Sequence, residues 1–260
     1  MDFAVSANDR QTIAMVRAAL EAGRLRLAYQ PIVLSSDTSR IGFYEGLIRV
    51  LDPTGRPIPA RDFMSAVEAH QIGRDIDCAA LTMGLNTLIR QPQLRLSINM
   101  SARSIGYPKW TAILRGALRA HPGVGERLIL EITESSAMLV PEIVIAFMDE
   151  LQIEGIAFAL DDFGAGYTAI RYFKDFAFDI LKIDGQFIRN IHADRDNQVV
   201  TAALLAIARQ FDMLCVAESV ETLADAEFLQ AIGVDCQQGY LFGAPTVTPP
   251  WTSTLGRHSA

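Results

Sequence analysis

Hydrophobic and polar positions near the start of the chain predict one helix followed by two strands. In residues 9–23, apolar side chains recur at helical spacing until a glycine ends the pattern. The runs 25–34 and 41–51 are mostly apolar, and the polar stretch 35–39 joins them. A short polar joint between two such runs is typical of an antiparallel pair of strands.

Helical and strand-like patterns alternate over the remainder of the chain. We expect helices near residues 61–70, 74–90, 108–120, 141–153, 168–174, 196–210 and 221–231, and strands at 94–100, 128–132, 156–160, 178–183, 213–217 and 234–236. Repeated helix–strand units predict an α/β fold with a parallel sheet and outer helices. About eight strands in about 250 residues favour a TIM-like (β/α)8 barrel over an open sheet, with the first strand out of step.

Composition narrows the class of protein. The 260 residues are 50% hydrophobic, which excludes a disordered chain and suffices for a large core. The net charge of −7 argues against binding of polymeric nucleic acid, although bound cations would still permit a small anionic ligand. Cys78, Cys215 and Cys236 form no disulfide-type spacing and predict reduced core thiols in a cytoplasmic chain. With no signal peptide pattern or long apolar run, we expect no membrane contact from these residues.

Polar oxygen-bearing side chains stand at or near the ends of most predicted strands. They are Glu45, Asn99, Glu131, Asp161, Asp162, Asp184, Glu218 and Gln238. The strand ends of a parallel barrel meet on one face, where carboxylates this close would repel one another without a positive charge. Carboxylate and amide oxygens without histidine or cysteine suit Mg²⁺ or Mn²⁺, and adjacent aspartates can flank two ions. A single such residue is more often a helix N-cap or an ion-pair partner, but that reading explains the whole set poorly.

Two further features accompany these carboxylates. Asp162-Phe-Gly-Ala-Gly-Tyr-Thr168 places two glycines beside the paired aspartates, in a loop that can approach a ligand or simply turn from strand to helix. Lys182 at a strand end is expected to meet a substrate phosphate, an attacking hydroxide or a neighbouring carboxylate. The spacing alone leaves these alternatives open.

Taken together, these segments resemble the EAL family of cyclic-di-GMP phosphodiesterases over about residues 25–245. The matching motifs, in family order, are Tyr29-Gln-Pro-Ile32, Glu45-Gly-Leu-Ile-Arg49, Ile98-Asn-Met-Ser-Ala102, Leu130-Glu-Ile-Thr-Glu-Ser135, Asp161-Asp-Phe-Gly-Ala-Gly-Tyr167, Leu181-Lys-Ile-Asp184, Ala217-Glu-Ser-Val-Glu221 and Gln238-Gly-Tyr-Leu-Phe-Gly-Ala-Pro245. The resemblance implies a TIM-like (β/α)8 barrel with an antiparallel first strand, formed by residues 25–248. Residues 1–24 are then a helical lead-in and 249–260 a tail.

The resemblance also implies hydrolysis of cyclic-di-GMP to the linear dinucleotide pGpG, assisted by two Mg²⁺ or Mn²⁺ ions. The implied ligands of one ion are Glu45, Asn99, Glu131 and Asp161, and those of the other are Asp161, Asp162 and Glu218. Lys182 resembles the residue that orients the water nucleophile, and Glu218, Glu221 and Asp184 resemble its supporting catalytic groups. The implied substrate-facing residues are Gln30, Glu45, Leu47, Arg49, Asn99, Asp161 and Gln238. Glu134 resembles the residue that steadies the Asp-Phe-Gly loop.

Three departures from the family pattern leave every acidic ligand in place. Gly46 replaces the alanine of the signature, Ser219 a glycine, and Ala165 a common threonine. We therefore expect an active enzyme. A receptor that binds cyclic-di-GMP without cleaving it, and a different barrel enzyme such as an enolase-type lyase, are the alternatives.

Assembly and regulation are expected to involve other copies or other domains. The resemblance implies a homodimer through residues 163–176, whose aromatic stripe Tyr167, Tyr172, Phe173 and Phe176, with Ile170, is equally compatible with core packing. It also implies an upstream sensory or GGDEF-type domain outside this chain.

Overall fold

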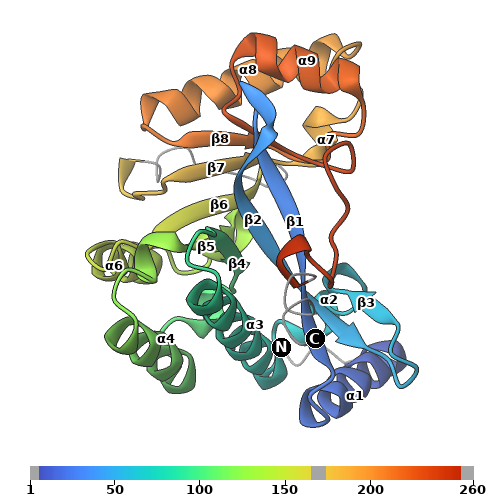
Figure 1. Ribbon diagram of the computed structural model, residues 1–260, viewed down its shortest axis with the longest axis vertical. Coiled ribbons are helices and arrows are strands. Elements are labelled where there is room, and N and C mark those ends of the chain that lie inside the picture. The colour runs from blue at the N-terminus through green and yellow to red at the C-terminus, as the bar shows by residue number, and fades with distance from the viewer. Residues whose placement is uncertain (1–5, 165–173, 253–260) are drawn as a thin grey trace, which may run out of the picture.

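A computed structural model describes residues 6–164 and 174–252 and contains a closed eight-stranded barrel (Figure 1). The barrel strands are β1 (Leu25–Leu34), β2 (Asp37–Leu51), β4 (Leu96–Asn99), β5 (Leu128–Thr133), β6 (Ala157–Phe163), β7 (Ile180–Ile183), β8 (Leu214–Ala217) and β9 (Cys236–Gln238). They follow the order β1-β9-β8-β7-β6-β5-β4-β2, and pairing of β1 with β2 closes the ring. This confirms the expected TIM-like barrel.

Strand β1 is antiparallel to both of its neighbours, β2 and β9, whereas β2 and β4–β9 pair in parallel. The predicted early hairpin is therefore correct, but its joint is shorter than expected. Strand β2 already begins at Asp37, so the turn is confined to Ser35 and Ser36. Residues 37–40 are polar because they are exposed, not because they leave the sheet.

Helices lie around the outside of the barrel (Figure 1). They are α1 (Ala7–Glu21), α2 (Met64–Val67), α3 (Gln71–Arg90), α4 (Pro108–Ala120), α5 (Glu134–Ala137), α6 (Pro141–Gln152), α7 (Gly185–Ile188), α8 (Arg195–Gln210) and α9 (Leu223–Ile232), with short 3-10 turns η1 (Ala60–Asp62), η2 (Ala102–Ser104), η3 (Gly125–Arg127) and η5 (Pro250–Thr252). Ser6 begins α1 with a capping box, and Gly233 ends α9 in the left-handed conformation that glycine tolerates. Of the helices described, none has the length and hydropathy needed to cross a membrane.

Three local expectations need correction or fall outside the described residues. The helix expected at 61–70 is divided into η1 and the four-residue α2, and a short strand β3 (Pro57–Pro59) precedes them. Helix α3 starts close behind α2, because Gly73 lets its backbone approach Val67, whose carbonyl oxygen would lie 2.8 Å from an added Cβ. The last strand lies two residues later than expected. The helix expected at 168–174 falls almost entirely in residues that the structure does not describe.

The barrel interior contains an apolar floor, defined by Ile32, Phe43, Ile129, Ala159, Ile180, Val216 and Cys236. Side chains alternate between the two faces of a strand, so residues two positions from the floor also point inward. On β1 this step leads back to Gln30 because that strand runs in the opposite direction. A second inward layer therefore follows from the positions of the floor residues.

Candidate active site

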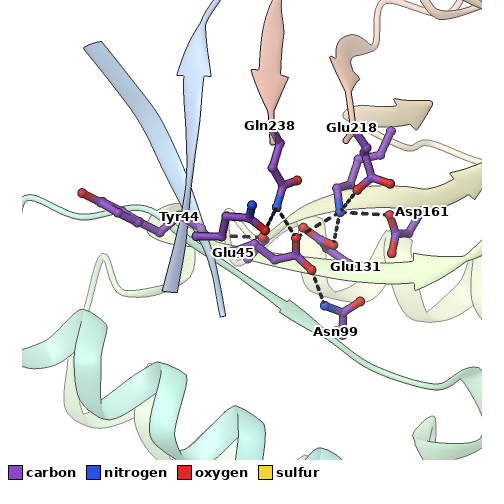
Figure 2. Close-up of polar contacts among 10 residues, drawn as sticks. Tyr44, Glu45, Asn99, Glu131, Asp161, Glu218 and Gln238 are labelled. Atoms are coloured by element: carbon purple, nitrogen blue, oxygen red, sulfur yellow. Dashed lines mark hydrogen bonds and ion pairs between the residues drawn. The ribbon is translucent and has the colours of Figure 1, made fainter. Parts of the chain in front are cut away.

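The second inward layer is polar and lies at the carboxyl ends of the parallel strands (Figure 2). It consists of Gln30, Glu45, Asn99, Glu131, Asp161, Lys182, Glu218 and Gln238. Each of the eight barrel strands thus supplies one side chain: Gln30 and Glu45 come from within β1 and β2, and the other six lie near the carboxyl end of their strand or just after it. The structure brings these sequence-predicted residues together.

Lys182 occupies the centre of four carboxylates. Its Nζ lies 2.7 Å from Glu218 Oε1, 2.8 Å from Glu131 Oε2 and 2.9 Å from Asp161 Oδ1. The Nζ–Oε2 distance to Glu45 is 3.4 Å. Its side chain is 1% exposed, so water screens these charges poorly. One ammonium group cannot neutralise four carboxylates, and the cluster therefore favours additional positive charge.

The pKa values of the cluster reflect this excess of negative charge. Burial and the neighbouring Glu45 raise the pKa of Glu131 to about 8, and burial raises the pKa of Glu218 well above its usual value. Burial opposes ionisation of Glu45, but Lys182 and two amide donors outweigh it and lower the pKa of that carboxyl. Burial also disfavours charge on Lys182, yet the surrounding carboxylates raise its pKa well above the usual value.

Amide side chains fix the orientation of Glu45. Asn99 Nδ2 donates to Glu45 Oε1 at 2.8 Å, and Gln238 Nε2 donates to Glu45 Oε2 at 2.7 Å (Figure 2). Gln238 Nε2 also lies 3.1 Å from Gln30 Oε1, and Gln30 Nε2 donates to the Gly243 carbonyl at 3.0 Å. Glu45 is therefore held by amide donors from β4 and β9, and Gln30 of β1 contacts the second of these donors.

Asp161 and Asp162 face the same site although consecutive strand residues normally point to opposite faces. Asp162 has a φ of 55°, and the pairing of β6 with β7 shifts register between Leu160 and Phe163. This irregularity turns Asp162 so that ligand oxygens of Asp161, Asp162 and Glu218 lie within 4.8 Å of one another. Burial, then the charges of Asp161 and Asp184, raise the pKa of Asp162 to about 6.

The donor set fits a divalent cation. Among the described residues, the buried Glu131 Oε1 has no hydrogen-bond partner, which is costly for a carboxylate oxygen unless a ligand satisfies it. The oxygen-only chemistry of the cluster matches hard cations such as Mg²⁺ and Mn²⁺. The acidic cluster is thus able to hold a metal ion.

The remaining predicted residues surround the cluster. Glu134 Oε2 accepts a hydrogen bond from the Gly164 backbone at 3.0 Å, which ties α5 to the end of β6. Asp184 caps α7 by accepting from the Gln186 backbone at 2.7 Å, the common structural role of such a residue. Glu221 is exposed, and its Oε1 lies 3.8 Å from Arg189 Nε.

A cavity of about 460 Å³ opens beside Glu45 and Glu218. Leu47 and Arg49, further along β2, line it. Sequence reasoning missed other lining residues, which are Pro59, Ala60, Arg61, Arg189, Ser219, Gly239, Tyr240 and Pro245. Arg189 follows β7 by six positions, and a rule that residues shortly after a barrel strand lie on this face could have identified it. Arg61 gave no comparable signal, because β3 was not expected.

The predicted stripe at 163–176 lies mostly outside the described residues, including Tyr167, Ile170, Tyr172 and Phe173. Phe176 is described and is buried, with its ring centroid 5.3 Å from that of Phe178. This member of the stripe packs within the chain.

The fold and the cluster define a TIM-like α/β barrel domain with a candidate cation site at the carboxyl ends of its strands. The chain belongs to the EAL domain family, whose sequence model matches residues 13–245.

Comparisons with individual proteins agree with this assignment. The chain is 32% identical over 254 residues to the bifunctional diguanylate cyclase/cyclic di-GMP phosphodiesterase MucR of Pseudomonas aeruginosa, covering 94% of this chain and 37% of MucR. It is 29% identical to the cyclic di-GMP phosphodiesterase PdeB of Shewanella oneidensis, covering 88% of this chain and 27% of that protein. The chain thus spans about a third of the length of these relatives.

Solved structures show the same architecture. The phosphodiesterase PaMucR in complex with c-di-GMP superposes with a TM-score of 0.79 at 32% identity, covering 91% of this chain and 97% of that chain. The FimX EAL domain of Pseudomonas aeruginosa bound to c-di-GMP gives a TM-score of 0.82 at 25% identity, covering 91% and 96%.

Proposed function

We propose that this chain is a divalent-metal-dependent phosphodiesterase that hydrolyses one phosphodiester bond of cyclic-di-GMP and yields pGpG. The observation that carries the proposal is the buried ring of four carboxylates around Lys182, with Glu131 Oε1 left unpartnered among the described residues. The complete acidic set distinguishes the chain from one in which a ligand has been lost. The named activities of the EAL relatives supply the substrate.

The carboxylates and one amide are proposed to hold two cations. Glu45, Asn99, Glu131 and Asp161 form one ligand set, and Asp161, Asp162 and Glu218 form the other. When bound, Mg²⁺ or Mn²⁺ would neutralise phosphate charge and increase the acidity of a water nucleophile. The amides of Asn99 and Gln238 keep Glu45 aligned for this role.

Other residues of the chain act on the nucleophile and the substrate. Lys182 Nζ, held among the carboxylates, is positioned to donate a hydrogen bond to the nucleophile and to orient it. Glu218, Asp184 and Glu221 are proposed to support this arrangement. Arg49, Arg61 and Arg189 line the cavity and complement the negative charge of a cyclic dinucleotide. Gln30, Leu47 and Gln238 complete the substrate-facing wall.

A turnover assay tests the proposal. The purified chain is incubated with cyclic-di-GMP and Mg²⁺ or Mn²⁺, and the products are separated by chromatography. We expect metal-dependent formation of pGpG that chelation stops. E45Q and E131Q are expected to lower kcat by at least about 100-fold, since each removes a charged ligand from a preorganised site. The matched control E142Q removes an exposed carboxylate of α6 and is expected to keep full activity.

The same experiment distinguishes the competing functions. Intact cyclic-di-GMP that nevertheless binds to the chain would establish a non-catalytic receptor. If the chain neither cleaves nor binds cyclic-di-GMP, the result would favour a different barrel metalloenzyme. Near-normal turnover by E45Q would remove Glu45 from the ligand set.

The proposal extends to organisation and location. Residues 25–248 are proposed as the phosphodiesterase barrel, with an upstream sensory or GGDEF-type domain in a longer protein, as the short coverage of MucR suggests. Homodimerisation is tested by sedimentation of the purified chain, and a strict monomer at high concentration would contradict it. Free, buried Cys78, Cys215 and Cys236 support a cytoplasmic location, where thiols remain reduced.

A further inference from the structure

Residues 246–252, which we call the C-terminal strap, lie beyond the family match and pack against β1 (Figure 1). Thr246 forms an isolated antiparallel bridge with Tyr29, in which Tyr29 N donates to the Thr246 carbonyl at 2.9 Å and Thr246 N donates to the Tyr29 carbonyl at 3.1 Å. The strap then forms η5, which carries Trp251. Of these residues, 249–252 belong to the segment expected to be a tail, and Trp251 within it packs against β1 and β2.

Trp251 contacts two tyrosines on the outer face of the β1–β2 hairpin. Its ring centroid lies 5.1 Å from that of Tyr29 and 4.8 Å from that of Tyr44, with interplanar angles of 75° and 78°. These are edge-to-face contacts, the favourable geometry for aromatic pairs. Tyr29 is itself fixed from α3, because its hydroxyl lies 2.6 Å from Thr87 Oγ1.

Each tyrosine immediately precedes a residue of the active-site cluster. Gln30 and Glu45 follow Tyr29 and Tyr44, and they face each other in the β1–β2 register. Because strand side chains alternate, the tyrosines point outward while Gln30 and Glu45 point inward. Figure 2 shows the Tyr44 ring directed away from the cluster that contains Glu45. Through the two tyrosine rings, Trp251 thus contacts both of the strands that position these polar groups.

A glycine in the β1–β2 hairpin explains why the contact with Trp251 would matter there. Gly46, next to Glu45, pairs with Tyr29 in the register and presents no side chain to it. Glycine inside a strand leaves the backbone less restricted. Trp251 packs on the side of the hairpin opposite the cluster and restricts the same segment.

We propose that Trp251 is a positioning residue that, through Tyr29 and Tyr44, holds Gln30 and Glu45 in the geometry needed for substrate and cation binding. This inference rests on the proposed function of the site. A small displacement of Glu45 would weaken its contacts with Lys182, Asn99 and Gln238 together. Misplacement by about 1 Å can cost about 100-fold in rate, so loss of the ring contacts is sufficient for a measurable defect.

The test compares W251A with W251F and with V247A, which truncates a half-exposed side chain of the same strap. For each full-length variant we would measure kcat and KM with Mg²⁺, the affinity for cyclic-di-GMP without metal by calorimetry, and the melting temperature. We expect W251A to remain folded, with kcat/KM about 10-fold lower and weaker metal-free binding of the dinucleotide. W251F and V247A should stay within about threefold of the wild type, because one retains a ring and the other leaves the contact intact.

Wild-type kcat/KM and affinity in folded W251A would overturn the inference, as would equal losses in W251A and V247A. If W251A does not fold, Y44L provides the test, because it removes the Tyr44 ring that Trp251 contacts. Reduced affinity of Y44L for cyclic-di-GMP would support the inference, and unchanged affinity would overturn it. A wild-type chain that binds cyclic-di-GMP without cleaving it would refute the proposed catalysis alone. The comparison of affinities would still test the role of Trp251.

Discussion

At the residue scale, Ile98 lies between two glycines behind the active-site cluster. A Cβ added at Gly46 would lie 2.7 Å from Ile98 Cδ1, and one added at Gly84 would lie 2.7 Å from both Cγ1 and Cδ1. Ile98 is 1% exposed, so neither contact can be relieved by moving the side chain into solvent. Gly46, which stands where the family signature has alanine, therefore leaves the space that the large side chain of Ile98 on β4 occupies.

This packing predicts the outcome of restoring the alanine of the signature. G46A is expected to lower the free energy of unfolding by about 1–2 kcal/mol, because the new methyl group overpacks against Ile98. I98V removes the clashing methyl group, so the double variant G46A/I98V should be more stable than additivity of the single variants predicts. Urea unfolding of the four proteins measures the coupling, and strict additivity would contradict the contact.

The sequence predicted the carboxylates of the site because each lies within or directly after a largely apolar strand. It could not predict that Asp162 turns toward Asp161, since this depends on a positive φ and a shift in register. The sequence also could not decide among the three partners considered for Lys182, whereas the structure places its Nζ among four carboxylates. Trp251 escaped notice because its role depends on a contact with strands more than 200 residues earlier.

At the element scale, Asp77 ties α3 to the turn after β4. Its Oδ2 accepts from Ser104 Oγ at 2.6 Å and from the Ser101 backbone at 3.1 Å. Burial raises the pKa of Asp77 to about 7 despite these bonds. The carboxyl group is therefore a protonated link between two elements in mildly acidic solution.

The raised pKa predicts a dependence of stability on pH. Between about pH 4 and pH 7 the folded chain retains a proton on Asp77 that the unfolded chain has lost. Its contribution is therefore largest at low pH and decreases as the pH rises to about 7, by up to about 1.4 kcal/mol per pH unit. D77N, which keeps an acceptor, should gain at least about 1 kcal/mol relative to the wild type between pH 5 and pH 8.

Urea unfolding of the wild-type protein, D77N and D149N at pH 5 and pH 8 measures this change in stability. Asp149 is an exposed aspartate of α6 and serves as the control, for which no relative gain is expected. Equal pH dependence in the wild type and D77N would show that Asp77 is ionised throughout.

Element boundaries were predictable where apolar residues mark burial and less so elsewhere. Helix α4 begins and ends as expected because Pro108 is its first residue and its buried face is regular. Strand β9 was placed too early because Gln237 and Gln238 are polar but buried, at 0% and 4% exposure. Their amides bind other groups inside the fold, and this use of polar side chains is invisible to a hydrophobic pattern.

At the scale of the whole molecule, the net charge of −7 is partly concentrated in the barrel. A cation that binds the folded cluster and not the unfolded chain must stabilise the fold. At about 100 times its dissociation constant, Mg²⁺ would contribute about 2.7 kcal/mol. This corresponds to an increase of about 5–10 °C in the melting temperature for a chain of this size.

Thermal melts with Mg²⁺, or with NaCl at equal ionic strength, test this expectation. The increase should be specific to Mg²⁺, reversed by chelation, small in E131Q and intact in E142Q. Equal increases in E131Q and the wild type would place the stabilising ion elsewhere.

The pairing of β1 with β9 has a consequence for the time at which the site forms. Gln30 and Gln238 are hydrogen-bonded neighbours although 208 positions separate them in the chain. While the protein is being translated, every carboxylate of the cluster leaves the ribosome before β9 does, but the ring of strands cannot yet close. Such long-range closure is a slow, late event in folding. A nascent or prematurely terminated chain would thus carry all the acidic residues without arranging them. The active-site cluster can assemble only after β9 has been synthesised.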